Sequence, residues 1–190
     1  MEKPIMDDVI KGYEELIAKI DMEIKKIDEG KVEQKSEEER IANHLEKLKN
    51  HLVSKELDAA ALCLSNFLAE KAFKDENLFM KIFEIFKGRM HLYESILEEI
   101  DKDIKYLKNL SKESPFLKDL LKSSKHGRKL VLLLQEKEIQ SQYDRLQSDI
   151  EKSNGQLMNF FQDSLEDYKN KLLEIKENLK LIDEQLQSEE

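Results

Sequence analysis

The segment MDDVIKGYEELIAKIDMEIKKI (residues 6–27) decides the fold class of this chain. Its apolar side chains follow one another at alternating steps of four and three residues, the spacing of a coiled-coil seam along one helix face. The members of this N-terminal seam are Met6, Ile10, Tyr13, Ile17, Ile20, Ile24 and Ile27. The segment therefore predicts an amphipathic helix over about residues 5–29, with an apolar face that a partner should cover.

The same spacing recurs in residues 79–107 and again near the C-terminus. The members of this C-terminal seam are Phe161, Leu165, Tyr168, Leu172, Ile175, Leu179, Ile182 and Leu186. Seams this regular exceed what packing inside one small bundle requires, so they favour a homodimer or a helical hetero-partner.

Helix-start signals divide the rest of the chain. Ser36 begins a capping-box pattern, Asp75 fits an N-cap, and Pro115 suits the first turn of a helix. Together with the apolar spacing, these signals predict further helices at about residues 37–74, 76–110, 115–152 and 156–187.

The composition excludes a fold built on sheets. Charged residues make up 38% of the chain, which has only 5 Gly and 2 Pro for the many turns that sandwiches and barrels require. No Pro/Gly/Ser-rich linker divides the sequence. We therefore predict an all-α fold, an elongated antiparallel bundle of four to five long helices with coiled-coil-like heptad packing, and a single domain over residues 1–190.

Three positions leave the helix boundaries open. The apolar phase shifts around Val53-Ser54, which indicates a kink, a broadened face or a real break. Asn154-Gly155 is either a tight turn between antiparallel helices or part of one long helix containing a stutter. Because Gly and Asn are poor helix formers, we expect a turn or bend within residues 153–156 and another near Ser123–Gly127.

The sequence lacks the residue patterns that most catalytic, metal-binding and nucleic-acid-binding sites require. The net charge of −9 disfavours general nucleic-acid binding, and a single cysteine, Cys63, provides neither a disulfide framework nor a cysteine-rich zinc site. None of the four histidines has a glutamate three residues before it, as ferritin-like metal sites require, and the five glycines are too scattered for a phosphate loop. We expect no enzyme activity, no catalytic, metal or cofactor site and no small-molecule ligand. Cys63 lies in an apolar run and is expected to be a buried thiol.

The strongest charge asymmetry lies between residues 102 and 129, a segment that contains nine basic residues and only three acidic ones. The candidate patch for an acidic partner or anionic lipid consists of Lys118, Lys122, Lys125, Arg128 and Lys129. The structural interpretation is that these cations offset a helix dipole or pair with the acidic tail that begins at Asp163.

The pattern as a whole favours a non-catalytic interaction module, that is, a scaffold, adaptor, tether or secreted effector that binds another protein through its helical seams. One alternative is peripheral attachment to an anionic membrane through the basic segment. The other is a helical-bundle enzyme or metal protein, which no residue pattern in the sequence supports. The N-terminus resembles no signal peptide, and no apolar run approaches a membrane span. We expect a cytoplasmic protein unless a non-standard secretion route operates.

Overall fold

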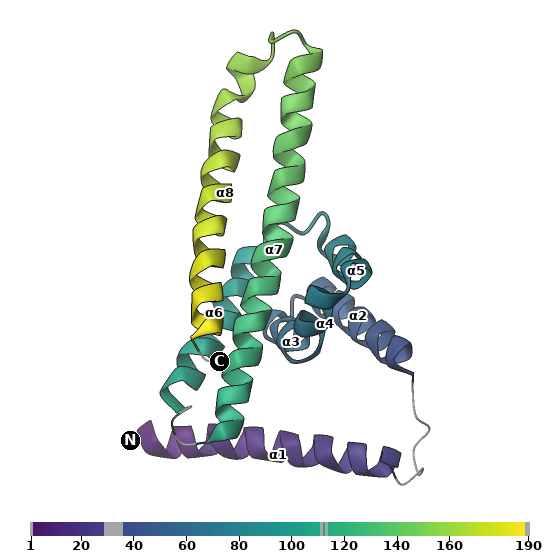
Figure 1. Ribbon diagram of the computed structural model, residues 1–190, viewed down its shortest axis with the longest axis vertical. Coiled ribbons are helices and arrows are strands. Elements are labelled where there is room, and N and C mark those ends of the chain that lie inside the picture. Colours follow the sequence, from purple (N-terminus) through teal and green to yellow (C-terminus); the bar gives the residue numbers. More distant parts are fainter. Residues whose placement is uncertain (1, 29–35, 111, 113, 189–190) are drawn as a thin grey trace. The chain divides into compact units, whose positions relative to one another are not determined.

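The computed structural model describes residues 2–28, 36–110, 112 and 114–188, and every regular element among them is helical (Figure 1). In the first helix, side chains are described for residues 7–25. The predicted all-α class is therefore confirmed. The coiled-coil-like packing and the antiparallel arrangement of the bundle as a whole stay predictions.

The described residues form seven uninterrupted helical segments rather than the four to five expected. The elements are α1 (Glu2–Asp28), α2 (Glu37–Val53), α3 (Leu57–Cys63), the π-helical turn η1 (Leu64–Leu68), α4 (Ala69–Lys74), α5 (Glu76–Phe86), α6 (Leu92–Leu110), α7 (Pro115–Lys152) and α8 (Met158–Gln187). α3, η1 and α4 follow one another without a gap and make one segment.

Contacts between Cα atoms divide the chain into two compact units, Met1–Arg40 and Ile41–Glu190. The described part of the first unit is α1 and the first turn of α2, and the second unit holds the remaining helices. The prediction of one domain over residues 1–190 stays a prediction.

Two of the predicted helix starts carry the expected caps. The Ser36 hydroxyl accepts a hydrogen bond from the Glu39 amide at 3.2 Å. The Asp75 carboxylate accepts from the amides of Asn77 and Leu78 at 3.0 and 3.3 Å. Each side chain satisfies donors that the first helical turn leaves without a backbone partner.

Two of the predicted long helices are broken. The predicted helix 37–74 ends at Val53 and restarts at Leu57, because Lys55 adopts a left-handed φ of 58°. The phase shift at Val53-Ser54 is thus a real break. The predicted helix 76–110 is wrong: Gly88, with φ of 80°, follows the C-cap residue Lys87 and separates α5 from α6.

The chain reverses at Asn154-Gly155, whose φ angles of 55° and 81° are both left-handed. The Gly155 amide donates to the Ile150 carbonyl at 3.1 Å, and the Ser153 hydroxyl donates to the same carbonyl at 2.7 Å. α7 and α8 therefore lie side by side as a helical hairpin, and the turn interpretation is confirmed (Figure 1).

The bend expected near Ser123–Gly127 is wrong, because α7 is helical through these residues. Gly127 is buried, and a Cβ atom built there would lie 2.9 Å from the Cβ and 3.0 Å from the Cα of Ser65. Gly127 therefore allows α7 to approach η1 closely rather than breaking the helix.

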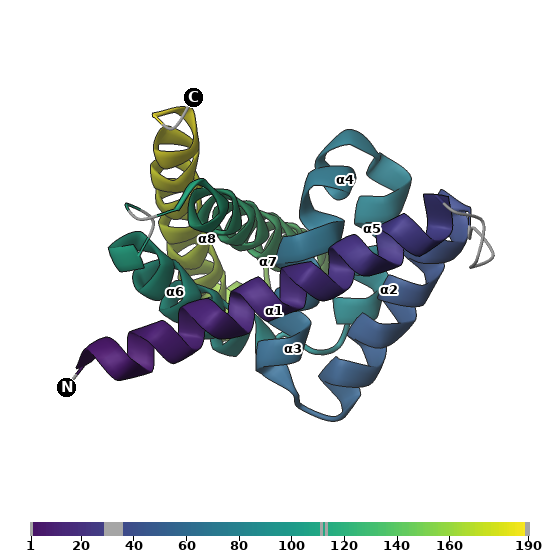
Figure 2. The ribbon, with the colours of Figure 1, turned by 90° about the horizontal axis from the view of Figure 1, so that it is seen from below.

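α7 is the central helix of the second unit and packs against α6, α8, η1 and α4. Figure 2 looks along α7, with α6 and α8 on one side of it and α4 on the other. The core contains Phe86 and Tyr93, both fully buried, with their rings stacked 5.0 Å apart. This packing joins α5 to α6 across the break at Gly88.

Candidate functional site

The N-terminal seam lies on α1, and its described side chains are partly to half exposed. Ile20 and Ile24 are 49% and 51% exposed, and Leu16 beside them is 45% exposed. Ile10, Tyr13 and Ile17 are partly exposed. The side chains of Met6 and Ile27 lie outside the described residues.

α1 has little within its own unit that could cover this seam. The other described residues of that unit, 36–40, are all exposed. An amphipathic helix of this length gains most of its stability from packing of its apolar face, since isolated helices are marginal in water. The seam is therefore a candidate binding surface.

The C-terminal seam is largely used inside the second unit. Leu172, Ile175 and Ile182 are buried, and α8 packs along α7. The remaining members, Phe161, Leu165, Tyr168, Leu179 and Leu186, are partly exposed. The binding role of this seam stays a prediction, but most of its apolar surface already faces α7 and the core.

The five residues of the candidate basic patch differ in their surroundings. Lys118 is exposed and Lys122 half-buried, whereas Lys125 is only 6% exposed. Arg128 Nε lies 2.7 Å from Asp101 Oδ1, and Lys129 Nζ lies 2.9 Å from Asp183 Oδ1.

Lys129 also lies over the Phe73 ring, 5.1 Å from its centroid. Its partner Asp183 belongs to the acidic tail, as the structural interpretation of the basic segment expects. The five cations therefore do not form one free cationic face.

A polar cluster that the sequence analysis missed joins α6, α7 and α8. Lys171 Nζ donates to Glu94 Oε1 at 2.7 Å, and Gln135 Nε2 donates to the same oxygen at 2.9 Å. With Asp101 and Arg128, these residues line a cavity of about 200 Å³. No spacing rule could have predicted this cluster, because its members come from three separate helices.

The electrostatics of this cluster are those of a satisfied ion pair. The hydrogen bonds from Lys171 and then Gln135 lower the pKa of Glu94. Burial alone would lower the pKa of Lys171, but the hydrogen bond and charge of Glu94, together with Glu174, outweigh it and raise that pKa. Both groups are held in their charged forms, which suits neither a general base nor a nucleophile near neutral pH.

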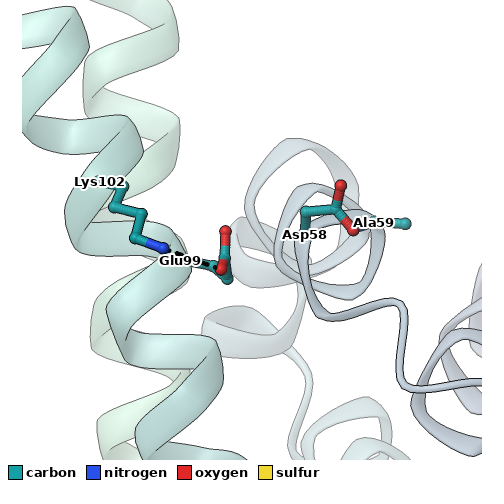
Figure 3. Close-up of polar contacts among 4 residues, drawn as sticks. All are labelled: Asp58, Ala59, Glu99 and Lys102. Atoms are coloured by element: carbon teal, nitrogen blue, oxygen red, sulfur yellow. Dashed lines mark hydrogen bonds and ion pairs between the residues drawn. The ribbon is translucent and has the colours of Figure 1, made fainter.

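Acidic side chains also gather between α3 and α6. Figure 3 shows Lys102 reaching Glu99 at 3.3 Å, while Asp58 at the start of α3 accepts from the Ala59 amide at 2.9 Å. Burial, and then the charges of Glu99 and Asp58, raise the pKa of Asp103. Among the described residues, no group of three or more His, Cys, Asp or Glu side chains is placed to hold a metal ion.

Cys63, expected to be a buried thiol, is only partly buried and packs against the edge of the core. Its thiol donates to the His44 carbonyl at 3.4 Å, and the His44 ring stacks on Phe67 with the centroids 3.9 Å apart. Burial raises the pKa of Cys63 to about 11, against a smaller opposing effect of Lys47. Burial, and then Lys47, lower the pKa of His44, so the imidazole is not a cation that could stabilise a thiolate.

We expect Cys63 to react slowly with iodoacetamide at pH 7.5. Fewer than about one thiol in a thousand is ionised when the pKa lies more than three units above the pH, and the thiolate is the nucleophile. Alkylation followed by mass spectrometry should show a rate at least about tenfold below that of the same chain unfolded in urea. Equal rates in the two states would show that the thiol is neither buried nor suppressed.

A groove of about 670 Å³ lies beside α5 and α7. Phe79, Phe83 and Leu133 form its apolar lining, with Lys137 over the Phe83 ring. Its other lining residues are Glu136, Gln140, Ser141, Asp144 and Lys176. Because the groove carries both acidic and basic side chains, its lining favours neither an anionic nor a cationic ligand.

The sequence analysis also missed Phe160, which is 81% exposed at the start of α8. Phe160 stands next to the seam residue Phe161 but one residue out of phase with it. Its position beside the 153–157 turn leaves it uncovered, a detail that the apolar spacing alone does not reveal.

In the described part of the chain, no helix is both long and apolar enough to pass through a bilayer. Comparisons of the chain with protein-family models, with curated proteins and with solved structures found no match.

Proposed function

We propose that this protein is a non-catalytic helical interaction module that binds another protein through the N-terminal seam of α1. The observation that carries the proposal is the exposure of Leu16, Ile20 and Ile24, each about half open to solvent along one side of a 27-residue helix. Full burial of such a side chain is worth about 1.5–3 kcal/mol. Covering the exposed halves of several of them supplies a substantial driving force for helix pairing.

The chemistry of the second unit supports binding rather than catalysis. The Glu94–Lys171 pair is neutralised internally, and the Cys63 thiol is held in its protonated form. Arg128 and Lys129 are already paired with carboxylates, which favours a protein partner over anionic lipid. Coiled-coil pairing, an adaptor, scaffold or tether role, and a cytoplasmic location belong to the same proposal.

The test compares the wild-type chain with an Ile17→Lys/Ile24→Lys double variant, which places two charges on the seam. The matched control is Asp8→Gln/Glu15→Gln, which changes the net charge by the same amount on the opposite helix face. The tagged chains are expressed in the native cells, and the recovered proteins are quantified by mass spectrometry.

We expect at least one protein to be recovered with both the wild type and the control, and to fall at least about tenfold with the seam variant. The same proteins recovered in equal amount with all three chains would contradict the proposal. Circular dichroism of the purified variants checks that the helix content is retained.

A further inference from the structure

The flank of the N-terminal seam carries a continuous acidic row. With Ile10, Ile17 and Ile24 at the a positions of the heptad, the e positions are Asp7, Glu14, Asp21 and Asp28. α1 is helical over all of these residues, so the row runs directly beside the seam. Asp7, Glu14 and Asp21 are exposed.

The other flank provides no basic residue to balance this row. The g positions are Val9, Leu16 and Glu23. In a parallel pair of two α1 helices, the e residues of one helix would face the g residues of the other, which places carboxylates against apolar side chains or against Glu23. In an antiparallel pair, the two acidic rows would face each other.

Neither orientation of a self-pair therefore forms an opposite-charge pair across the seam, and the antiparallel one opposes like charges along the whole e row. The lysines of this helix do not change the outcome. Lys11 and Lys25 occupy b positions, and Lys19 and Lys26 occupy c positions, away from the contact with a partner helix. The charge pattern therefore disfavours pairing of α1 with the α1 helix of a second copy of this chain.

We propose that the partner of α1 is an amphipathic helix of another protein that carries an apolar seam and a row of Lys or Arg facing the acidic e row. This inference rests on the proposed function and names the chemistry of the partner. The basic row would place one cation opposite each of Asp7, Glu14 and Asp21, so charge selects the partner while the isoleucines provide the contact area.

The probes are two synthetic peptides of about four heptads with Ile at a and Leu at d, one with Lys at e and g and the other with Glu there. Their binding to the full-length chain is measured by fluorescence anisotropy. We expect the Lys peptide to bind at least about tenfold more tightly than the Glu peptide at about 50 mM salt. The difference in affinity between the two peptides should become smaller at about 300 mM salt, because salt screens exposed charges.

A matched pair of variants distinguishes the effect of the acidic row from the effect of the net charge of the helix. Glu14→Lys/Asp21→Lys reverses two charges on the row and should invert the preference toward the Glu peptide. Asp8→Lys/Glu15→Lys makes the same change in net charge at the f positions, on the opposite face, and should keep the preference for the Lys peptide. Equal loss of Lys-peptide binding in both variants would show that only net charge matters and would overturn the inference.

The remaining outcomes also decide the question. Tighter binding of the Glu peptide overturns the inference, and so does binding of neither peptide, as expected if the seam is already occupied. Sedimentation equilibrium showing a dimer of the 22.4 kDa chain that Ile17→Lys abolishes would make a second copy the occupant. In each of these cases the proposed function falls only if the seam-dependent recovery from cells also fails.

Discussion

Replacing Gly127 with alanine should destabilise the second unit by about 1–3 kcal/mol, although alanine is the better helix former by about 1 kcal/mol. The added Cβ atom would overlap the Ser65 side chain and would also lie 3.0 Å from the Ser65 Cα atom, so rotating that side chain away would not make enough room. α7 and η1 would have to move apart, with loss of contact along both. Urea unfolding followed by circular dichroism at 222 nm measures the change.

Gly12 provides the matched control for this substitution. It also lies inside a helix, but among the described residues no heavy atom comes within 4 Å of a Cβ atom built there. Gly12→Ala should therefore give only the intrinsic gain of helix stability, up to about 1 kcal/mol. If Gly127→Ala stabilised the chain by a similar amount, the close approach of α7 to η1 would be wrong.

The largest loss of stability is expected for Phe86→Ala, at about 3–5 kcal/mol. Phe86 is fully buried and stacks on Tyr93, so its removal leaves a cavity where α5 and α6 meet. The same urea titration measures the loss, and the slope of the transition checks that the unfolded state is unchanged.

Tyr93→Phe is the companion variant, because it keeps the ring and removes only the hydroxyl. Within the described part of the chain, this hydroxyl has no hydrogen-bond partner of good geometry, although burial and then the nearby Glu138 carboxylate raise its pKa. We expect Tyr93→Phe to change the stability by less than about 1 kcal/mol. A loss of the same size as that of Phe86→Ala would mean that the hydroxyl, not the stacked rings, holds this part of the core.

The helices that the sequence predicts best are those with strong local signals. The start of α7 at Pro115 and its end at Lys152 match the prediction, and so does the N-cap at Asp75. These features depend on residues within one or two turns of each other, and capping and proline geometry act over that range.

The break at Gly88 shows why apolar spacing alone fails. The seam runs through Phe86, Met90 and Tyr93 in regular steps because α5 and α6 bury their apolar faces in the same core on either side of the break. Periodicity reports which side chains are buried, not whether the backbone between them stays helical. The extended ψ of 128° at Lys87 and the left-handed conformation of Gly88 separate the two helices.

Gly127 shows the opposite error. A glycine inside a helix predicts weakness from local propensity, but its role here depends on Ser65, which lies 62 positions earlier in the sequence. The pairing of Glu94 with Lys171 is equally non-local. The acidic row of α1, in contrast, is fully visible in the sequence, because it needs only the heptad register of one helix.

The unbroken course of α7 also has a mechanical consequence. From Gly127 to Lys152 the helix extends about 38 Å, and the 153–157 turn with exposed Phe160 stands at its far end. A tilt of about 5° about the contact with Ser65 would therefore displace that turn by about 3 Å over this length. The length of α7 beyond Gly127 therefore turns a small change of helix direction at the contact with η1 into a larger displacement of the hairpin end.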